Sequence, residues 1–553
     1  MRESKELGAY ILGPDQEVES QNLLSDYYSI QPQPGDTKQR VKFGTAGHRG
    51  TSTLGSFNEA HILAIAQAIA EFRQQQGICG PMFVGMDTHG LSSPAQRTVL
   101  EVFSAHEIDI YIAPLTGDAR YTPTPVISYA ILHYNRGKIR HLADGLIITP
   151  SHNPPCDGGI KYNSPSGGPA QPIATQWIEA RANQLLGNGN REVKRWTYEK
   201  ALKAPTTHIY DYISGYVRDL CTVVDLKALS TSDIHIGVDP LGGSSVCYWD
   251  AIAEHYQLKL DILERTIDPS FYFLAPDWDG KRRMDCSSPE VMANLVKVRD
   301  KYDIAFGNDA DSDRFGVVTP NAGLIPPNHF LAVAIGYLAQ SRSDWSASGV
   351  IGKSIVTSDM LNRVARSIGY SLYEAPIGFR WFVPGLQEGS LNFAGEESAG
   401  ASFQRKDGSV WTTDKDGIVM NLLAAEIFAK SGKDLSRHYQ DLTDKYGECY
   451  YTKIFVPAKP GQKKKLSQLS EFEISASTLA GDPIVAKFTR APANDASLGG
   501  IKIRTTNGWF VARPSGTEMV EPVYKVYGES FKSEHHLDLL MQEAIQIVNN
   551  VTQ

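Results

Sequence analysis

Short apolar runs and amphipathic stretches alternate along most of this chain, and the alternation repeats three times. Short apolar runs predict strands, whereas apolar positions three and four residues apart predict helices. The first unit is predicted as strands at 81–85, 109–113 and 145–148 with helices at 59–72, 95–103 and 126–134. The second is predicted as strands at 234–238, 259–263 and 304–306 with helices at 248–256 and 289–299. The third is predicted as strands at 350–351, 354–356, 371–374 and 391–393 with a helix at 360–367.

The last strand of each unit runs directly into a polar motif. These motifs begin near Ser151, Asp309 and Glu396. Alternating strands and helices at this spacing predict parallel sheets built from βαβ crossovers. Because ligands bind beyond the carboxyl ends of strands in such sheets, we expect the three motifs to share one cleft.

The C-terminal segment follows a different pattern. Alternation at 484–490, 501–505, 509–512 and 522–527 predicts antiparallel strands, with Asn507-Gly508 as a hairpin turn and a helix at 535–548. The predicted fold class is α/β, with three consecutive mixed α/β domains of βαβ type around a central cleft. A C-terminal α+β domain with an antiparallel sheet follows them. The predicted division is an N-terminal extension at 1–40 and domains at 41–225, 226–322, 323–445 and 446–553.

Composition narrows the class of protein. The 553 residues exceed what one hydrophobic core serves, and 42% hydrophobic with 21% charged residues is ordinary for a soluble enzyme. The net charge of −8 argues against a nucleic-acid partner and means that phosphate needs a local cationic cluster. The six cysteines include no CxxC pair, residues 1–40 hold no secretory apolar segment, and no apolar run is long enough to span a membrane. We therefore expect a soluble cytoplasmic protein.

The sequence TPSHNP at 149–154 places Ser151 between an apolar strand and a sharp turn. Such a turn exposes the serine hydroxyl at the end of the strand, where it can act as a nucleophile. The alternative is a turn-forming Ser-His-Asn-Pro without chemistry. A hydrolase elbow is excluded, because G-x-S-x-G is absent around Ser151.

Asp309, Asp311 and Asp313 stand at alternate positions, so in an extended segment their side chains face one way. Three crowded carboxylates repel one another unless a cation lies among them, which predicts a hard-metal site. The alternative is a solvated acidic turn. An EF-hand is excluded, because Arg314 takes its glycine position and Pro320 its twelfth position.

The sequence GEESAG at 395–400 places Glu396, Glu397 and Ser398 between glycines. Two carboxylates and a hydroxyl on flexible backbone suit the vicinal hydroxyls of a sugar. Taken alone, however, Gly-Glu-Glu is also an ordinary loop composition.

The sequence RPSGT at 513–517 offers a guanidinium, two hydroxyls and unhindered backbone amides. Arginine's planar fork and glycine's accessible amide suit an anion such as phosphate. The alternative is a charged hairpin end without a ligand.

Together with GTAGHRG at 44–50, these motifs resemble in combination and order the α-D-phosphohexomutase superfamily, most closely its prokaryotic phosphoglucomutases. The resemblance runs from about residue 40 to about residue 530 and includes DGGIKYN at 157–163. It implies reversible interconversion of α-D-glucose 1-phosphate and D-glucose 6-phosphate through a phosphoserine enzyme and glucose 1,6-bisphosphate.

The resemblance also implies a role for each motif. Ser151 carries the phosphoryl group and, with Asp309, Asp311 and Asp313, holds one Mg²⁺ per chain. Substrate binding is implied for Arg314, Gly378, Arg380, Glu396, Glu397, Ser398, Arg513, Ser515, Gly516 and Thr517. Within that set, Glu397 and Ser398 are the main candidates for the sugar hydroxyls, and residues 513–517 for the non-reacting phosphate.

The remaining catalytic roles concern charge and protons. Lys161 and Arg49 would neutralise the phosphoserine, and His152 would border it. Lys406, in QRKDG at 404–408, resembles the lysine proposed as proton acceptor in glucose-specific members, and Lys161 with Arg49 is the competing choice. Either lysine would need a lowered pKa to act as a base near neutral pH.

Several alternatives remain open at this point. Within the family they are a phosphomannomutase, a dual-specificity phosphohexomutase and a phosphoglucosamine mutase, although the last typically has a methionine in its serine loop. Outside it they are a catalytically silent scaffold paralogue and a metal-dependent phosphatase. We expect small sugar phosphates as partners, glucose 1,6-bisphosphate as activator, no nucleic acid, no membrane, and a monomer or homodimer.

Overall fold

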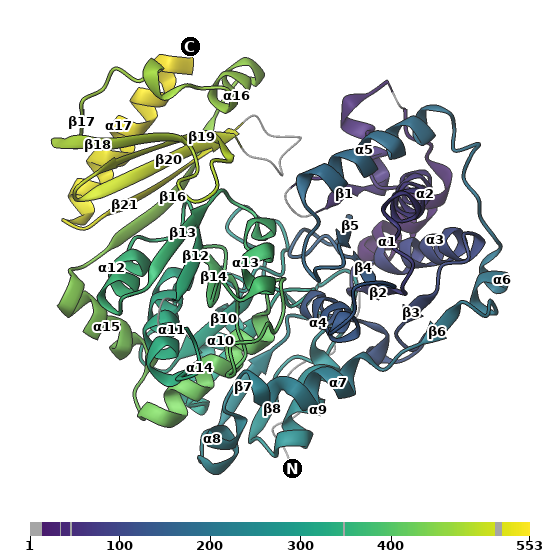
Figure 1. Cartoon of the computed structure of the whole chain (residues 1–553), viewed down its shortest axis with the longest axis horizontal. Helices are drawn as coiled ribbons and strands as arrows, with labels where there is room; N and C mark the ends of the chain where they lie inside the picture. Colours follow the sequence, from purple (N-terminus) through teal and green to yellow (C-terminus); the bar gives the residue numbers. More distant parts are fainter. Residues whose placement is uncertain (1–13, 34, 45–46, 347–348, 515–522, 553) are drawn as a thin grey trace.

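The computed structural model describes residues 14–33, 35–44, 47–346, 349–514 and 523–552. They form four sheets, called I to IV in chain order (Figure 1). In Figure 1 sheet I lies on the right, sheets III and IV lie on the left, and sheet II lies at the bottom centre. Sheets I to III are mixed and sheet IV is antiparallel, which confirms the predicted fold class.

Each sheet has a strand order that differs from the order along the chain. Across sheet I the strands are β1 (His48–Thr51), β5 (Asp157–Asn163), β4 (Asp144–Ile148), β2 (Met82–Met86), β3 (Ile110–Ile112) and β6 (Thr207–Ile209). Across sheet II they are β11 (Gly323–Leu324), β10 (Phe315–Thr319), β9 (Ile304–Asn308), β7 (Ile236–Asp239) and β8 (Leu260–Ile262). Across sheet III they are β13 (Ser371–Ala375), β12 (Val350–Ser354), β14 (Phe393–Glu396) and β15 (Gly400–Phe403). Across sheet IV they are β16 (Tyr450–Pro457), β21 (Val523–Ser530), β20 (Gly508–Pro514), β19 (Ser497–Thr505), β18 (Asp482–Arg490) and β17 (Thr478–Leu479).

The helices that accompany sheet I are α1 (Pro14–Ser29), α2 (Glu59–Gln76), α3 (Ser92–Ala105), α4 (Thr124–Asn135), α5 (Pro172–Gly187), α6 (Tyr198–Leu202) and α7 (Tyr212–Asp219). Those near sheet II are α8 (Leu226–Thr231), α9 (Val246–Tyr256) and α10 (Ala293–Lys297). The next are α11 (Pro327–Ser341), α12 (Met360–Ser367), α13 (Val383–Glu388), α14 (Gly417–Ser431) and α15 (Leu435–Tyr446). Helices α16 (Pro460–Ser467) and α17 (Glu534–Thr552) pack on sheet IV.

Sheets I, II and III repeat one arrangement. In each, one parallel strand (β4, β9 or β14) pairs with the unit's first parallel strand (β2, β7 or β12), and the next strand along the chain returns antiparallel to it. The strands predicted from the sequence form parallel sheets and do not include the return strands β5, β10 and β15. Strand β5 reads as a loop because it contains two glycines, yet a Cβ on Gly159 would lie 2.1 Å from the Thr149 carbonyl oxygen. Its glycine therefore permits close approach to the serine loop.

Smaller differences concern element lengths. The helix predicted at 289–299 is the short α10 followed by a 3₁₀ turn at Arg299–Lys301. The two short strands predicted at 350–351 and 354–356 are the single strand β12. Part of the N-terminal segment forms α1, whose Tyr27 is buried with its hydroxyl 3.0 Å from Thr98 Oγ1 of α3.

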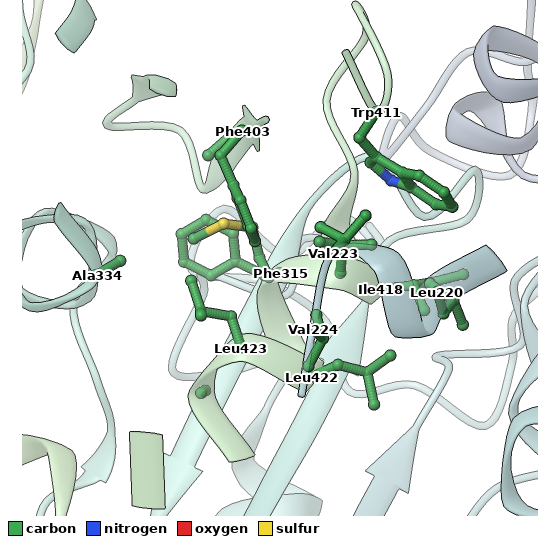
Figure 2. Close-up of a cluster of buried hydrophobic side chains, with 14 of the residues drawn as sticks. Leu220, Val223, Val224, Phe315, Ala334, Phe403, Trp411, Ile418, Leu422 and Leu423 are labelled. Carbon is green, nitrogen blue, oxygen red and sulfur yellow. The ribbon is translucent and has the colours of Figure 1, made fainter. Parts of the chain in front are cut away.

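One cluster of buried apolar side chains runs through the first three sheets. It includes Ile147 of β4, Phe306 of β9 and Phe393 of β14. Figure 2 shows the part of this cluster in which Phe315 of β10 and Phe403 of β15 lie with residues of α14. Because the units share this core, the turns that carry the three motifs are held in a fixed relation.

Sheet IV has a separate core with α17 and touches sheet III through a smaller cluster. The smaller cluster joins Ile355 and Val356 to Trp509, Val511 and Tyr527. Among the described helices, none combines the length and apolar character that a membrane crossing requires.

Candidate active site

The three motifs lie in matching turns. Each turn joins a parallel strand to the antiparallel return strand that follows it, as β4 to β5, β9 to β10 and β14 to β15. Each contains one non-glycine residue in the left-handed region: Ser151 at φ 61°, Ser312 at φ 56° and Ala399 at φ 66°. Such residues cost roughly 1–3 kcal/mol each and cluster at functional sites.

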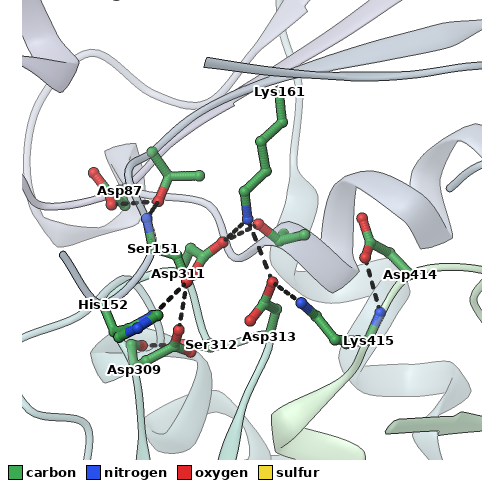
Figure 3. A network of polar contacts seen from close by, with 12 residues as sticks. Asp87, Ser151, His152, Lys161, Asp309, Asp311, Ser312, Asp313, Asp414 and Lys415 are labelled. Carbon is green, nitrogen blue, oxygen red and sulfur yellow. Dashed lines mark hydrogen bonds and ion pairs between the residues drawn. The ribbon is translucent and has the colours of Figure 1, made fainter. Parts of the chain in front are cut away.

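The hydroxyl of Ser151 is buried and points at the aspartate loop (Figure 3). It donates to Asp309 Oδ2 at 2.8 Å, and His152 Nδ1 lies 3.4 Å from the same hydroxyl oxygen. The Ser151 backbone N–H donates to Thr149 Oγ1 at 2.7 Å, and the Thr149 hydroxyl donates to Asp87 Oδ2 at 2.6 Å. This series of hydrogen bonds holds Ser151 in its strained conformation.

Asp87, which supports the serine loop, is a site residue that sequence reasoning missed. Its other oxygen, Oδ1, accepts from Ser92 Oγ at 2.6 Å, and His89 Nδ1 lies 2.8 Å from Oδ2. Burial raises the pKa of Asp87, but His89 and the hydroxyl donors outweigh it and hold the pKa below the usual value. The available signal was a polar Asp-Thr-His directly after the predicted strand 81–85.

Asp309, Asp311 and Asp313 are buried, and each offers an oxygen within 4.8 Å of the others. Asp311 Oδ1 and Asp313 Oδ1 have no hydrogen-bond partner among the described residues. Burial, followed by the charges of the other two aspartates, raises the pKa of Asp309 well above its usual value. A divalent cation would be held by these oxygens and would relieve the repulsion, so the donor set fits Mg²⁺.

Lys161 on β5 joins the serine loop to the aspartate loop. Its ammonium donates to Asp311 Oδ2 at 2.6 Å and to Asp313 Oδ2 at 3.3 Å. The Thr124 hydroxyl at the start of α4 also donates to Asp311 Oδ2, at 2.6 Å. Burial opposes the ammonium charge, but Asp311 and Asp313 raise the pKa of Lys161 above its usual range. Because its ammonium is held between two carboxylates of the metal loop, Lys161 suits charge neutralisation.

Arg49 on β1 and Arg314 after the aspartate loop supply guanidinium groups. Arg49 Nη1 donates to Asn153 Oδ1 at 3.5 Å, and the Arg314 backbone N–H donates to Asp309 Oδ1 at 3.0 Å. Both Nε groups are buried and lack a hydrogen-bond partner in the part of the chain that the structure describes. Burial and Arg314 lower the pKa of His152 well below its usual value, which favours a neutral imidazole. Unpaired guanidinium donors close to a serine loop suit a phosphoserine.

The sugar-binding candidates Glu396 and Glu397 differ in their anchoring. Glu396 is buried, and its Oε1 accepts the Gly378 backbone N–H at 2.8 Å. Burial raises the pKa of Glu396. Glu397 Oε2 accepts from Ser354 Oγ at 3.1 Å, and Glu397 and Ser398 are only half-buried. Glu397 and Ser398 are thus the more accessible pair, and their sugar-binding role stays a prediction.

The candidate phosphate ligands lie on separate elements. Arg380 Nη2 donates to the Gly44 carbonyl at 2.6 Å, so it joins the unit of sheet III to that of sheet I. Arg513 is half-buried on β20, directly opposite Lys525 of β21. Opposite residues share a face of the sheet, so Lys525 is a cationic neighbour that sequence reasoning missed. Ser515, Gly516 and Thr517 lie outside the described residues.

Two lysines that follow the sugar loop, Lys406 and Lys415, lie in different places, and only the first was considered from the sequence. Lys406 is not brought to the cluster, because its Nζ donates to the Cys221 carbonyl at 2.9 Å. Burial lowers the pKa of Lys406. Lys415 Nζ lies 3.0 Å from Asp313 Oδ2, and its side chain packs so close to Gly400 of β15 that a Cβ there would lie 2.2 Å from Lys415 Cδ. Lys415, which the sequence did not single out, therefore lies between the metal and sugar loops, whereas the proton-acceptor role expected for Lys406 stays a prediction.

Comparison with known proteins accounts for this arrangement. Three family models match the chain: Phosphoglucomutase/phosphomannomutase alpha/beta/alpha domain I at residues 40–186, domain II at 214–323 and domain III at 326–446. A phosphoglucomutase of Komagataeibacter xylinus is 52% identical, over 96% of this chain and 95% of that protein. A phosphoglucomutase/phosphomannomutase of Thermococcus kodakarensis is 24% identical, over 91% of this chain and 99% of that protein.

Solved structures share the fold. The open form of parafusin, a Paramecium phosphoprotein described as a phosphoglucomutase, aligns with a TM-score of 0.74 at 19% identity, over 94% of this chain and 96% of that one. A phosphoglucomutase/phosphomannomutase family protein of Burkholderia thailandensis aligns with a TM-score of 0.67 at 19% identity, over 92% and 98% of the two chains. At these identities the likeness concerns the fold.

Proposed function

The chain belongs to the phosphoglucomutase/phosphomannomutase family, and from this premise we propose that it is a phosphoglucomutase. It interconverts α-D-glucose 1-phosphate and D-glucose 6-phosphate through a phosphorylated Ser151. The observation that carries the proposal is the Ser151 hydroxyl, buried 2.8 Å from Asp309 in a strained turn near unpaired arginine donors.

In the forward half-reaction, phosphorylated Ser151 gives its phosphoryl group to the free hydroxyl of the bound hexose phosphate. A bond forms between phosphorus and the sugar oxygen as the bond between phosphorus and Ser151 Oγ breaks. The product is glucose 1,6-bisphosphate, which turns over so that Ser151 recovers the other phosphoryl group. Lys161, Arg49 and Arg314 stabilise the charge of the transferring group.

One Mg²⁺ per chain would be held by Asp309, Asp311 and Asp313 with Ser151, and would supply a Lewis acid for the transfer. Other side chains keep the serine loop in position. The neutral His152 borders the serine, and the hydrogen bonds from Thr149 and Asp87 keep the turn in place.

The attacking sugar hydroxyl must lose its proton, and we assign that proton to Lys415. Burial lowers the pKa of Lys415, but Asp313 and Glu396 outweigh it and raise the pKa above the usual value. Lys415 is therefore charged when bisphosphate is bound and can give a proton to the departing sugar oxygen. The neutral amine that remains then accepts the proton of the next attacking hydroxyl.

Glu397 and Ser398 would bind sugar hydroxyls, with Glu396 and Gly378 supporting their loop. Arg513, with Ser515, Gly516 and Thr517, would hold the phosphate that does not react. Lys525 adds a second cation to that clamp, because it stands directly opposite Arg513. One clamp serves both substrates, because the two ends of the sugar exchange places between half-reactions.

The proposal is tested by Ser151→Ala, with Ser164→Ala as a control on the loop after β5. Ser151→Ala should fold normally and lose nearly all interconversion, measured in both directions without added bisphosphate. Ser164→Ala should keep wild-type rates. Interconversion by Ser151→Ala at more than about a hundredth of the wild-type rate would contradict the assignment, since losing a covalent nucleophile costs far more than that.

Substrate class and metal are tested on the wild-type protein. Activity with glucose phosphates should disappear on chelation and return with Mg²⁺. Higher kcat/KM for mannose phosphates than for glucose phosphates would instead favour a phosphomannomutase. Release of inorganic phosphate from glucose 1,6-bisphosphate without isomerisation would favour a phosphatase.

A further inference from the structure

A tight turn between β8 and α10 presents an exposed tryptophan. The Asp277 N–H donates to the Lys281 carbonyl at 2.8 Å, and the Gly280 N–H donates to the Asp277 carbonyl at 2.8 Å. Gly280 takes φ 78° in this turn, which favours glycine. Trp278 lies within the turn and is 64% exposed, the highest exposure among the described tryptophans.

The turn is firmly held although its tryptophan is exposed. Arg283 Nη2 donates to Asp279 Oδ2 at 2.7 Å, and Arg283 Nη1 lies 3.5 Å from Asp277 Oδ2. The Ser288 hydroxyl donates to Asp277 Oδ1 at 2.7 Å. A large apolar side chain that is exposed on an ordered turn indicates a site of contact with another part of the molecule.

The contact that Trp278 makes is with sheet IV. Its ring stacks on Phe455 of β16 with 5.8 Å between ring centroids and 29° between planes. Phe455 stands directly opposite Lys525, and Lys525 stands directly opposite Arg513, so the three share one row on one face of the sheet. Lys525 Nζ lies 5.0 Å from the centre of the Phe455 ring, within cation–π distance.

The same connection also reaches the serine end of the site. Seven residues after Trp278, Asp285 Oδ2 lies 3.9 Å from Arg314 Nη1. The segment from Trp278 to Asp285 thus links the groups around Ser151 to the row that contains Arg513.

Sheet IV has a core of its own and is attached to sheet III through the cluster that joins Ile355 and Val356 to Trp509, Val511 and Tyr527, so the Trp278 contact is a second attachment, to the sheet II unit. We propose that Trp278 is a positioning residue: its stacking on Phe455 holds the Arg513 row against the sheet II unit, so that glucose 1,6-bisphosphate is retained while it turns. This inference rests on the proposed function. A stacked aromatic pair shifts the balance between held and released arrangements by about two- to tenfold.

The first test compares Trp278→Ala with wild type, with and without added glucose 1,6-bisphosphate. With saturating bisphosphate, kcat should stay within about twofold of wild type, because Trp278 does not touch the reacting groups. Without it, the rate should fall by about two- to tenfold, and bisphosphate found in the medium per turnover should rise by a similar factor. Trp278→Phe keeps an aromatic ring, so its rate and its bisphosphate release should lie close to those of wild type.

Phe472→Ala is the matched control, because Phe472 is an aromatic residue of the C-terminal segment that is 90% exposed. It should behave as wild type in both conditions. An equal loss of activity from Phe472→Ala would overturn the inference, since it would show that any exposed aromatic residue of this segment gives the same effect.

A second readout does not depend on catalysis. The chain has eight tryptophans, so the emission of Trp278 is obtained as the difference between wild type and Trp278→Phe. The same difference is then measured in the Phe455→Ala background, with and without Trp278→Phe. There it should lie at longer wavelength, as expected for an indole whose stacking partner is replaced by water. Unchanged emission would overturn the contact and with it the inference.

Two kinds of failure are distinguishable. A wild-type protein that carries out no interconversion would overturn the proposed function and this inference with it. Normal wild-type interconversion with unchanged bisphosphate release from Trp278→Ala would overturn only the role of Trp278.

Discussion

Two Lys-Asp-Gly triplets stand close together after the sugar loop, and the structure places them in opposite environments. The first, Lys406-Asp407-Gly408, is a turn on the surface, where Asp407 accepts from the Ser409 backbone N–H and hydroxyl. The second, Lys415-Asp416-Gly417, begins α14 beside the metal loop. Identical local sequence therefore lies beside the metal loop in one place and in a surface turn in the other.

The residues around each triplet decide the difference. Asp416 is buried and accepts from Trp411 Nε1 at 2.8 Å and from the Tyr216 hydroxyl at 2.9 Å. It also caps α14 by accepting the Val419 backbone N–H at 2.9 Å. These contacts fix the backbone next to Lys415, which directs its ammonium to Asp313. Among the hydrogen bonds of the described residues, those that Asp407 accepts come from Ser409 of its own turn.

The glycines differ in the same way. A Cβ on Gly417 would lie 2.1 Å from the Arg314 carbonyl oxygen, so α14 approaches the metal loop only because this residue lacks a side chain. Gly408 takes φ 77°, and its nearest neighbour would be the Asp344 carbonyl oxygen at 3.5 Å. Gly417 is needed for close approach, whereas Gly408 is needed for a turn.

The largest expected difference is between Lys415→Met and Lys406→Met. Losing the proton donor and acceptor should lower kcat by about 10²- to 10⁴-fold in Lys415→Met, with KM changed far less. Lys406→Met should stay within about twofold of wild type, because its ammonium binds only a backbone carbonyl among its described contacts. A large fall in kcat for Lys406→Met would reverse the comparison and restore Lys406 to the reaction.

A smaller difference is expected between Gly417→Ala and Gly408→Ala. The new methyl group at Gly417 meets rigid backbone, so we expect a loss of about 3 kcal/mol in the free energy of unfolding and weakened Mg²⁺ binding. Gly408→Ala should cost about 1 kcal/mol for left-handed backbone and leave Mg²⁺ binding intact. Denaturant unfolding and metal titration measure both. Equal effects at the two positions would mean that α14 does not depend on close approach to the metal loop.

The smallest expected difference is in the pH dependence of stability. Burial raises the pKa of Asp416 to about 6, against hydrogen bonds from the Val419 N–H, Trp411 and Tyr216. The folded pKa exceeds the unfolded value of about 3.9, so the folded state binds the proton more tightly and stability rises as pH falls. Between pH 7 and pH 5, wild type should gain about 1 kcal/mol relative to Asp416→Asn.

Asp407 is the control for that measurement. Its pKa is lowered by the Ser409 hydrogen bonds, so its stabilising contribution is lost as pH falls through its folded pKa. Between pH 7 and pH 5, the free energy of unfolding of wild type should therefore not rise relative to that of Asp407→Asn. A gain there of the same size as for Asp416→Asn would show that the titration belongs to other groups.

Much of this fold follows from local patterns. The helix predicted at 360–367 and the strand predicted at 371–374 coincide with α12 and β13, because apolar periodicity decides both. The return strand β5 could not be predicted from local patterns. Its two glycines allow close approach to Thr149 and Phe57, and that approach depends on tertiary packing. Strand propensity alone assigns such a segment to a loop.

The site residues also differ in whether local patterns predict them. Ser151 and the three aspartates follow predicted strands directly, so their convergence could be inferred from the repeated βαβ pattern. Lys415 could not, because its place depends on how Asp416 and Gly417 pack against elements far away in the sequence. Spacing from the sugar loop pointed to Lys406, which lies away from the metal loop, and gave no sign of Lys415.

The mechanism depends above all on Ser151 as the residue that carries the phosphoryl group. The direct measurement is intact mass and peptide mapping after incubation with glucose 1,6-bisphosphate, followed by excess glucose 6-phosphate. We expect one phosphoryl group on Ser151 that is lost when glucose 6-phosphate is added, with glucose 1,6-bisphosphate appearing in its place. Phosphate on another residue, or phosphate on Ser151 that glucose 6-phosphate does not remove, would contradict this mechanism.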